Sequence, residues 1–340
     1  MIPRLKQAVA VLAIALLSAT AGWGHTVNVG TVNVRSGPGT SYSIVGTLSQ
    51  GTVVYVIGTS GSWSHINYPK SGWVYSAYLT DTPHVGQIAI PSRVVMVIFE
   101  NKSYSKIIGN PSAPYINSLA SLGATFTSSH GVTHPSQPNY IALFSGSTQG
   151  VTNDVVPPPG SPWSSANLAS RLLAGGRTFA GYCEGLPSTG SLVATYGRYA
   201  RKHNPWSDFS NVPSSLNKPF SSFPTTYSSL PTVSVVVPDL YNDMHDGPIS
   251  AGDTWLKSHL SAYVLWAKTH NGLLIITFDE DDFTVSNQIP TVFVGPMVKP
   301  GRYGQWINHY NVLRTLCGMY RLSAPGKAAT ATPITNVWKM

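Results

Sequence analysis

Acidic side chains gather directly after three apolar segments of this 340-residue chain. They follow the segments 94–99, 233–237 and 273–278, and comprise Glu100, then Asp239, Asp243 and Asp246, then Asp279, Glu280, Asp281 and Asp282. These eight are most of the 13 acidic residues. Carboxylates that converge repel one another unless a cation binds them or their pKa values shift. The pattern therefore favours a metal site over ordinary polar turns at strand ends.

A serine and several histidines could supply chemistry at such a site. Ser136 lies in the polar segment 133–140, just before a predicted helix over residues 139–144. A hydroxyl at a helix N-terminus lies in a positive potential that stabilises anions, and a bound metal would make it a nucleophile. The histidines in polar segments near candidate site residues include His134, His245 and His309, whereas we interpret His203, His259 and His270 as ordinary hydrogen-bonded loop residues.

The segments that would position these residues alternate between uninterrupted apolar runs and segments in which apolar residues have helical spacing. Uninterrupted apolar runs at 94–99, 233–237, 273–278 and 291–294 predict strands buried on both faces of a sheet. Helical spacing of apolar residues is present at 166–175, 254–269 and 308–320. This alternation predicts an α/β sandwich with a mostly parallel sheet, and ligands bind beyond the carboxyl ends of such strands.

The N-terminal residues 1–24 have the features of a signal peptide. Arg4 and Lys6 precede an apolar run at 8–17, which is too short to span a membrane, and small residues follow at 19–21. We therefore expect an exported protein that is secreted, periplasmic or associated with the cell wall. Removal of this segment changes the formal net charge from +8 to +6, which would attract an anionic substrate. Because Lys and Arg are mostly scattered, we expect no nucleic-acid binding.

Residues 25–80 form a separate predicted domain with five short strands, at 26–29, 31–34, 53–57, 61–66 and 72–74. The sequence at 33–39, Trp63 and the Gly-Trp-Val at 72–74 resemble the bacterial SH3 domain, a small all-β barrel. The resemblance implies either a peptidoglycan ligand in the cell wall or a passive stabilising module. Residues 81–92 contain two prolines and are predicted to be a linker, which leaves residues 93–340 as the second domain.

The second domain resembles a known enzyme family. Its motifs lie at 100–104, 109–115, 134–140, 199–206, 242–247, 277–282 and 307–311. They are similar to those of the exported bacterial phosphoesterases, a group with acid phosphatases and phospholipases C in the alkaline-phosphatase-like superfamily. The resemblance implies that fold and one divalent metal ion, bound by Glu100, Asn101, Ser136, Asp279 and Glu280. The choice of ligands among residues 279–282 stays open.

The resemblance also implies roles for the remaining site residues. Ser136 would be the nucleophile that forms a phospho-enzyme, and the histidines that would bind phosphate or protonate the leaving group are His134, His245 and His309. The residues that we expect to contact the substrate are Asn139, Arg201 and Lys202; the basic segment 198–203 could receive a second anionic group.

The expected activity is hydrolysis of phosphate monoesters, with phosphorylated small molecules, phosphoinositides and other phospholipid headgroups as candidate substrates. The alternatives are a phosphodiesterase of the phospholipase C type and an inactive cell-wall-binding protein. Cys183 and Cys317 could form a disulfide in an oxidising compartment or remain two buried thiols.

Overall fold

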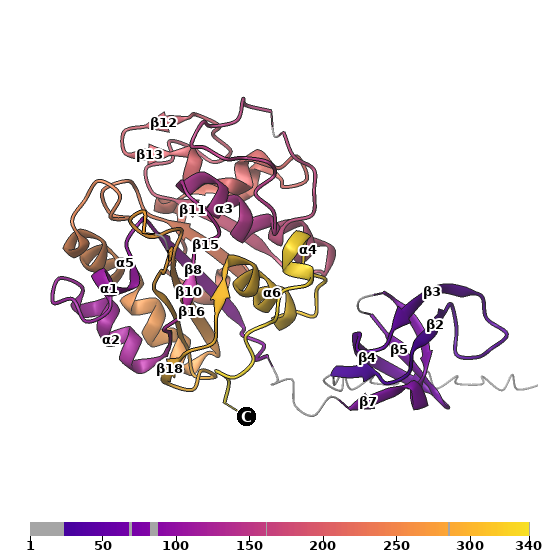
Figure 1. Cartoon of the computed structure of the whole chain (residues 1–340). Coiled ribbons are helices and arrows are strands. Elements are labelled where there is room, and N and C mark those ends of the chain that lie inside the picture. The colour runs from indigo at the N-terminus through magenta and orange to yellow at the C-terminus, as the bar shows by residue number, and fades with distance from the viewer. Residues whose placement is uncertain (1–23, 68–69, 82–87, 161, 285, 340) are drawn as a thin grey trace, which may run out of the picture. The chain divides into compact units, whose positions relative to one another are not determined.

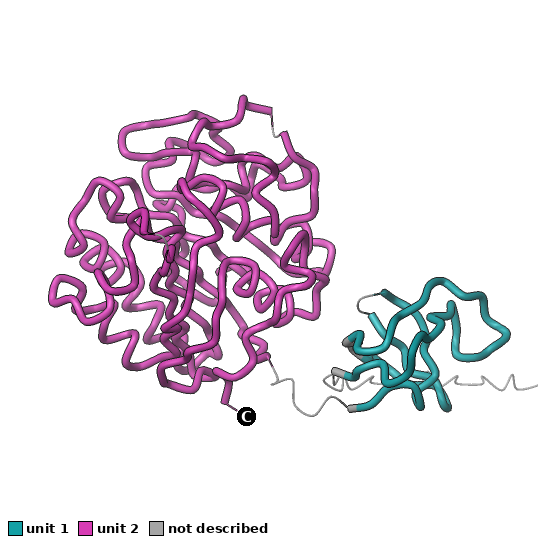
Figure 2. Tube along the Cα trace, viewed as in Figure 1, with its two compact units in different colours: residues 1–83 teal, residues 84–340 magenta. Residues whose placement is uncertain are grey.

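The chain divides into two compact units, residues 1–83 and 84–340 (Figure 2). The computed structural model describes residues 24–67, 70–81, 88–160, 162–284 and 286–339. Nearly all of the predicted signal peptide and residues 82–87 of the predicted linker therefore lie outside the described residues. Among the described residues, no helix combines the length and the apolar character needed to cross a membrane.

The first unit is a seven-stranded sheet in the order β3-β2-β6-β5-β4-β1-β7. Its strands are β1 (Gly24–Val27), β2 (Thr31–Arg35), β3 (Ile44–Ser49), β4 (Val53–Ser60), β5 (Trp63–Ile66), β6 (Gly72–Tyr75) and β7 (Leu79–Asp81). Alternate residues such as Val32 and Val34 fill its core. The five predicted strands are present, but the sequence analysis missed β3 and β7. In β3 the apolar residues Ile44 and Val45 are exposed, so the strand lacks the alternation that would have revealed it.

The second unit contains an eight-stranded sheet in the order β14-β11-β15-β8-β16-β17-β9-β18 (Figure 1). Its strands are β8 (Arg93–Phe99), β9 (Ala124–Phe126), β11 (Phe179–Cys183), β14 (Asn217–Pro219), β15 (Val233–Val237), β16 (Gly272–Phe278), β17 (Thr291–Val294) and β18 (Gly301–Tyr303). The strands from β14 to β16 run parallel, whereas β17 is antiparallel to both neighbours. The predicted, mostly parallel sheet is therefore confirmed.

Helices cover both faces of this sheet (Figure 1). On one face lie α3 (Ser136–Ser145), α4 (Leu168–Ala174) and α6 (His309–Met319), and on the other lie α1 (Tyr104–Ile107), α2 (Pro114–Leu122) and α5 (Ile249–Thr269). Short pairs complete the fold, β10 (Ser129–His130) with β19 (Ile307–Asn308), and β12 (Thr195–Tyr196) with β13 (Tyr199–Ala200). Helix α3 begins three residues earlier than predicted, at Ser136 itself. Of the two cysteine alternatives, the structure has two buried free thiols.

Candidate active site

The carboxyl ends of three adjacent parallel strands bring the predicted acidic residues together. Glu100 follows β8, Asp243 lies in the segment after β15, and Asp279 follows β16. Backbone hydrogen bonds join these segments, since Glu100 N–H donates to the Asp243 carbonyl oxygen at 2.8 Å and Asp279 N–H donates to the Phe99 carbonyl oxygen at 3.0 Å. All three carboxylates are buried, with at most 1 % of their surface exposed. Three of the eight acidic residues singled out in the sequence thus form one cluster in space, whereas Asp246 pairs with His245 and Asp282 pairs with Lys106.

Ser136 stands within hydrogen-bond distance of two carboxylates, that of Glu100 in the cluster and that of Glu280, which follows Asp279 in the chain. It is the first residue of α3, and its Oγ lies 3.0 Å from Glu100 Oε2 and 3.1 Å from Glu280 Oε1. Pro135 precedes it in an extended conformation, so the helix starts abruptly and the positive end of its dipole lies at the serine. A hydroxyl beside carboxylate acceptors and at a helix N-terminus has the environment of a nucleophile for an anionic substrate.

Burial and mutual repulsion disfavour the charged forms of these carboxylates. Burial raises the pKa of Glu100 well above its ordinary value, and the charges of Asp279 and Asp243 raise it further. Burial likewise raises the pKa of Asp279, with Glu280 adding to the effect. Burial also raises the pKa of Glu280 to about 7, although the hydrogen bond with Ser136 lowers it. A cation that binds between them would remove this penalty.

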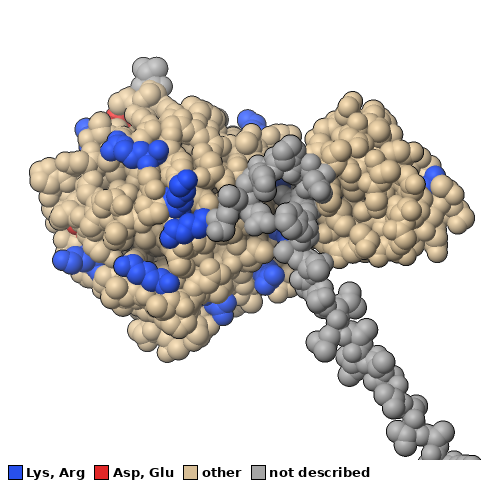
Figure 3. All heavy atoms as spheres, turned by 90° about the horizontal axis from the view of Figure 1, so that it is seen from below, with Lys and Arg blue, Asp and Glu red and all other residues tan. Residues whose placement is uncertain are grey.

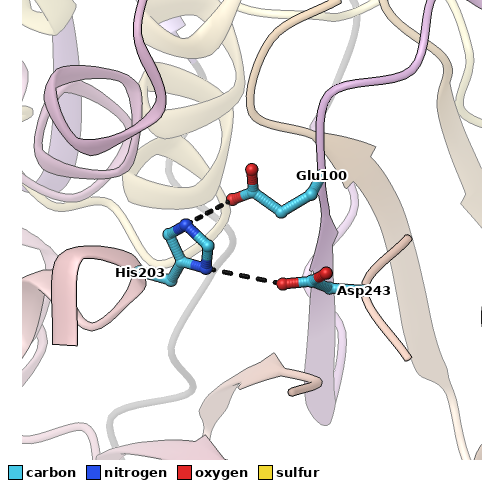
Figure 4. Close-up of side chains that lie close together, drawn as sticks. All are labelled: Glu100, His203 and Asp243. Atoms are coloured by element: carbon cyan, nitrogen blue, oxygen red, sulfur yellow. Dashed lines mark ion pairs between the residues drawn. The ribbon is translucent and has the colours of Figure 1, made fainter. Parts of the chain in front are cut away.

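His203, which the sequence analysis set aside, is part of the site. It is buried, and its ring lies between two carboxylates, with Nε2 3.0 Å from Glu100 Oε1 and Nδ1 3.4 Å from Asp243 Oδ2 (Figure 4). The Tyr140 ring stacks on it at 4.9 Å between centroids. Burial lowers the pKa of His203 well below its ordinary value, and Lys202 lowers it further. The sequence feature that could have identified His203 as a site residue is its position in the motif at 199–206, next to Arg201 and Lys202.

Two of the predicted histidines lie at the partly open side of the site. His134 Nδ1 is 2.6 Å from Glu280 Oε2, and its ring stacks on the exposed ring of Phe283. His245 Nδ1 is 2.7 Å from Asp246 Oδ1, and its Nε2 is 3.5 Å from Lys202 Nζ. Their side chains are 25 % and 28 % exposed, so both are open to solvent and to a ligand.

Lys202 brings a positive charge to the same side. Its Nζ lies 2.8 Å from Asp154 Oδ2, and Asp154 Oδ1 accepts a hydrogen bond from the backbone N–H of Gln137 in α3. Burial lowers the pKa of Lys202, but the hydrogen bond with Asp154 and the charge of Glu100 raise it, and the net shift is upward. Lys202 therefore stays charged near Ser136, and Asp154 joins the site without having been predicted.

Two residues that we expected to contact the substrate, Asn139 and Arg201, have their contacts within the protein itself. Asn139 forms four hydrogen bonds with the backbone of the segment before Ser136, so its amide shapes that segment rather than facing a substrate. Arg201 is buried, 3.6 Å from Asp208 Oδ1, and donates to the carbonyl oxygen of Pro157. It therefore does not present a free charge to an anion.

His309 is also more deeply placed than predicted. It is fully buried, and its Nε2 donates to the backbone carbonyl oxygen of Asp279. Burial lowers the pKa of His309 to about 4, so the ring is neutral at ordinary pH. This contact positions Asp279 and keeps the ring away from solvent, which does not fit direct proton donation to a leaving group.

The predicted metal ligands contain unpaired buried oxygens of the kind that a cation requires. Asp279 Oδ2 and Glu100 Oε1 have no hydrogen-bond partner, although Glu100 Oε1 faces His203. Asn101 lies at the edge of this group, with its backbone N–H donating to Asp279 Oδ1 at 3.0 Å and its Oδ1 accepting from Lys102. A second candidate set shares Glu100, because single ligand atoms of Glu100, His203 and Asp243 lie within 4.8 Å of one another.

Comparison with solved structures places this fold in a known class. A protein of the alkaline phosphatase superfamily from Vibrio parahaemolyticus superposes with a TM-score of 0.52 over 73 % of this chain and 72 % of its own, at 14 % sequence identity. Such low identity shows the fold alone. The second unit is thus an alkaline-phosphatase-like α/β sandwich, as predicted.

The chain belongs to the phosphoesterase family, whose model matches residues 110–323, and residues 30–80 match the bacterial SH3 domain. It is 52 % identical over 269 residues to a phosphatidylinositol-3-phosphatase of Mycobacterium tuberculosis, across 77 % of this chain and 89 % of that protein. It is also 28 % identical to an acid phosphatase of Aspergillus fumigatus, across 69 % of this chain and 56 % of that protein. The predicted family and the predicted enzyme class, a phosphoric ester hydrolase, are confirmed.

Proposed function

We propose that the chain is a metal-dependent phosphomonoesterase that works through a phosphoserine at Ser136. The observation that carries the proposal is the position of Ser136 Oγ, 3.0 and 3.1 Å from two buried carboxylates at the N-terminus of α3. Its relatives are named as phosphatases, and the relative at 52 % identity is named for a phosphoinositide. We therefore infer that phosphoinositides and related headgroup monoesters are substrates.

The residues that would hold the metal are Glu100, Asn101, Ser136, Asp279 and Glu280. They offer oxygen donors almost exclusively, which suits a hard divalent cation. When bound, such an ion lowers the pKa of the serine hydroxyl and neutralises charge that develops on the phosphoryl oxygens. This fits the raised pKa values of Glu100, Asp279 and Glu280, because the cation would stabilise their ionised forms.

Different residues of the protein then carry out the separate steps of the reaction. Ser136 donates its proton to the Glu280 carboxylate and attacks phosphorus, while the bond from phosphorus to the ester oxygen breaks. Lys202 and the N-terminus of α3 stabilise the negative charge on the phosphoryl group. His245, which is half-open and held by Asp246, donates a proton to the leaving oxygen. Water then attacks the phosphoserine, and the same groups act in reverse to release phosphate.

The first experiment compares a chromogenic phosphate monoester with the matching diester. Wild type should hydrolyse the monoester, and both Ser136→Ala and treatment with a chelator should abolish turnover. Ser145→Ala is the matched control, since this serine lies at the far end of α3 and bonds only to nearby groups. Mass spectrometry of the acid-quenched reaction should find a phosphoryl group on Ser136.

Two outcomes of this experiment contradict the proposal. Turnover of the diester alone would indicate the phospholipase C type of reaction. Full monoester turnover by Ser136→Ala would exclude the serine as the nucleophile.

We further propose that the first unit holds the exported enzyme at the cell wall. This rests on the match to the bacterial SH3 domain and on an exposed aromatic surface. The Trp63 and Tyr75 ring centroids are 5.6 Å apart, and those of Tyr75 and Tyr78 are 5.3 Å apart. Isolated peptidoglycan should retain the full chain but release a Tyr75→Ser, Tyr78→Ser variant. Equal retention of both proteins would exclude this surface.

A further inference from the structure

Charged side chains are segregated between the two ends of the second unit. Of the 13 acidic residues in the chain, only Asp81 precedes this unit. The other twelve lie past the carboxyl ends of the strands or in segments that contact that end. Asp253, for example, is in the first turns of α5, and Asp154 pairs with Lys202. The opposite end of the sheet, where the parallel strands begin, has no acidic residue within the described parts of the chain.

Six basic residues occupy that opposite end, and we call their surface the basic face. They are Arg93, Arg177, Lys268, Lys299, Arg321 and Lys339. Arg93 is the first residue of β8, Arg177 precedes β11 by two residues, and Lys268 precedes β16 by four. Lys299 comes two residues before β18, which runs in the same direction as β16.

Hydrogen bonds place the last two members on the same face. Lys339 N–H donates to the Met297 carbonyl oxygen, close to Lys299. Arg321 follows Tyr320, whose hydroxyl lies within hydrogen-bond distance of the carbonyl oxygens of Pro91, two residues before β8, and Thr232, immediately before β15. Seen from below, Lys and Arg spread across this surface of the unit and Asp and Glu are almost absent (Figure 3).

The charges on the basic face are available to a partner. Arg177, Lys268, Lys299 and Lys339 are exposed, and Arg93 and Arg321 are half-buried. Within the described ranges, none of the six forms an ion pair with a carboxylate. Arg93 instead donates to the carbonyl oxygens of Ser92 and Ser228, and Arg177 lies over the Tyr320 ring. Neither contact neutralises the positive charge.

We propose that the basic face docks the enzyme onto an acidic polysaccharide, a polymer that carries anionic groups along its length. Like charges that share one face without counter-charges are balanced by an extended anionic partner more effectively than by a single small anion. The partner is a polymer rather than an anionic bilayer because of where Ser136 lies. The seven residues of β8 separate the basic face from the catalytic end by about 20 Å. A bilayer bound at the basic face would leave its headgroups out of reach of Ser136.

Docking at this face has a consequence for catalysis. A polymer at the beginnings of the strands leaves the carboxyl ends open, so the docked enzyme still accepts substrate. The first described residues of the second unit, 88–92, also lie next to this face, since they lead into β8 at Arg93. Two modules that bind one support act together, because the second binding event is intramolecular. This inference is independent of the proposed monoester reaction.

The test measures binding of the full chain to immobilised dextran sulfate, a polyanion without phosphate ester bonds. The variant Arg177→Gln, Lys268→Gln, Lys299→Gln removes three exposed charges from the basic face. The control variant Lys218→Gln, Lys257→Gln, Arg302→Gln removes the same charge elsewhere. Its residues lie on β14, in the middle of α5, and beside the Tyr104 hydroxyl. None of the six substitutions touches the site around Ser136.

We expect the basic-face variant to bind on the order of a hundredfold more weakly, and the control to change by severalfold at most. Binding should weaken steeply with salt, and saturating polymer should leave hydrolysis of a small phosphate ester unchanged. Equal weakening of both variants would overturn the inference, because net charge alone would then explain binding. Inhibition by the polymer would also overturn it, since binding would then be at the catalytic end.

Vesicles of phosphatidylcholine with phosphatidylglycerol form the last arm of the test. Weak binding to them relative to dextran sulfate supports a polymer partner. Tighter binding to the vesicles, lost in the basic-face variant, would reassign the face to a membrane and overturn the polymer assignment.

Discussion

Metal-free protein should lose stability as the pH rises from 4.5 to 7.5, because its catalytic carboxylates are buried beside one another. Burial raises the pKa of Glu280 from about 4.5 to about 7. The folded protein therefore retains a proton on Glu280 that the unfolded chain releases between these values. The contribution of this proton to the free energy of unfolding is fully present below about pH 4.5 and is lost as the pH rises through about 7. A shift of this size corresponds to about 3 kcal/mol.

The assay is thermal unfolding of the full chain in the presence of a chelator at the two pH values. In a domain of this size, 1 kcal/mol changes the midpoint by about 2–4 °C, so Glu280 alone accounts for a fall of about 6–12 °C. Glu280→Gln cannot titrate and should show a smaller fall. Asp282→Asn is the matched control. Burial raises the pKa of Asp282, but hydrogen bonds from Lys106 and Ser103 lower it further, to about 2, so this carboxylate does not titrate between pH 4.5 and 7.5.

Divalent metal should reverse the loss at pH 7.5, because it binds the ionised carboxylates. A metal concentration one hundred times the Kd would restore about 2.7 kcal/mol. Two results would refute the reasoning. One is metal-free wild type that is as stable at pH 7.5 as at pH 4.5, and the other is Glu280→Gln that loses as much stability as wild type.

Three further predictions test the site and the fold. Ser136→Ala should reduce kcat for a phosphate monoester by about 1000-fold or more while the protein still unfolds in one cooperative transition, as steady-state kinetics and calorimetry would measure. His203→Leu should destabilise the protein by about 1–3 kcal/mol in denaturant unfolding at pH 7.5, because it removes the ring that faces Glu100 Oε1 and Asp243 Oδ2; an unchanged free energy of unfolding would contradict this. Gly181→Ala should destabilise it by about 2 kcal/mol or more, since the added Cβ would lie 2.0 Å from the Trp206 ring, and unchanged thermal unfolding would show that the indole can move.

The central strands of the second unit could be predicted because each is a short, uninterrupted apolar segment of the sequence. The segments 233–237 and 291–294 match β15 and β17 residue for residue. The direction of β17 could not be read from them, because a strand buried on both faces has the same composition in either direction. Helix α5 was predicted from Thr254 but begins at Ile249, since its first turn lacks the apolar spacing that marks its later part.

The sequence by itself determined the acidic residues of the site and their common location. Glu100 and Asp279 directly follow strands, and parallel strands end at one edge, so these carboxylates had to meet. Their family motifs also identified Ser136 as the serine beside them. These conclusions needed no contact between distant side chains, because each residue was fixed by its place at the end of a predictable element.

Only the tertiary structure decided which polar side chains face the cluster and which support it. His203 and Arg201 are two residues apart in one short turn, yet His203 lies between Glu100 and Asp243 while Arg201 turns to Asp208. Burial similarly separates His309 from His245, although both lie in polar motifs. Irregular segments have no periodicity from which side-chain direction can be inferred, so packing against the rest of the domain sets the direction of each side chain.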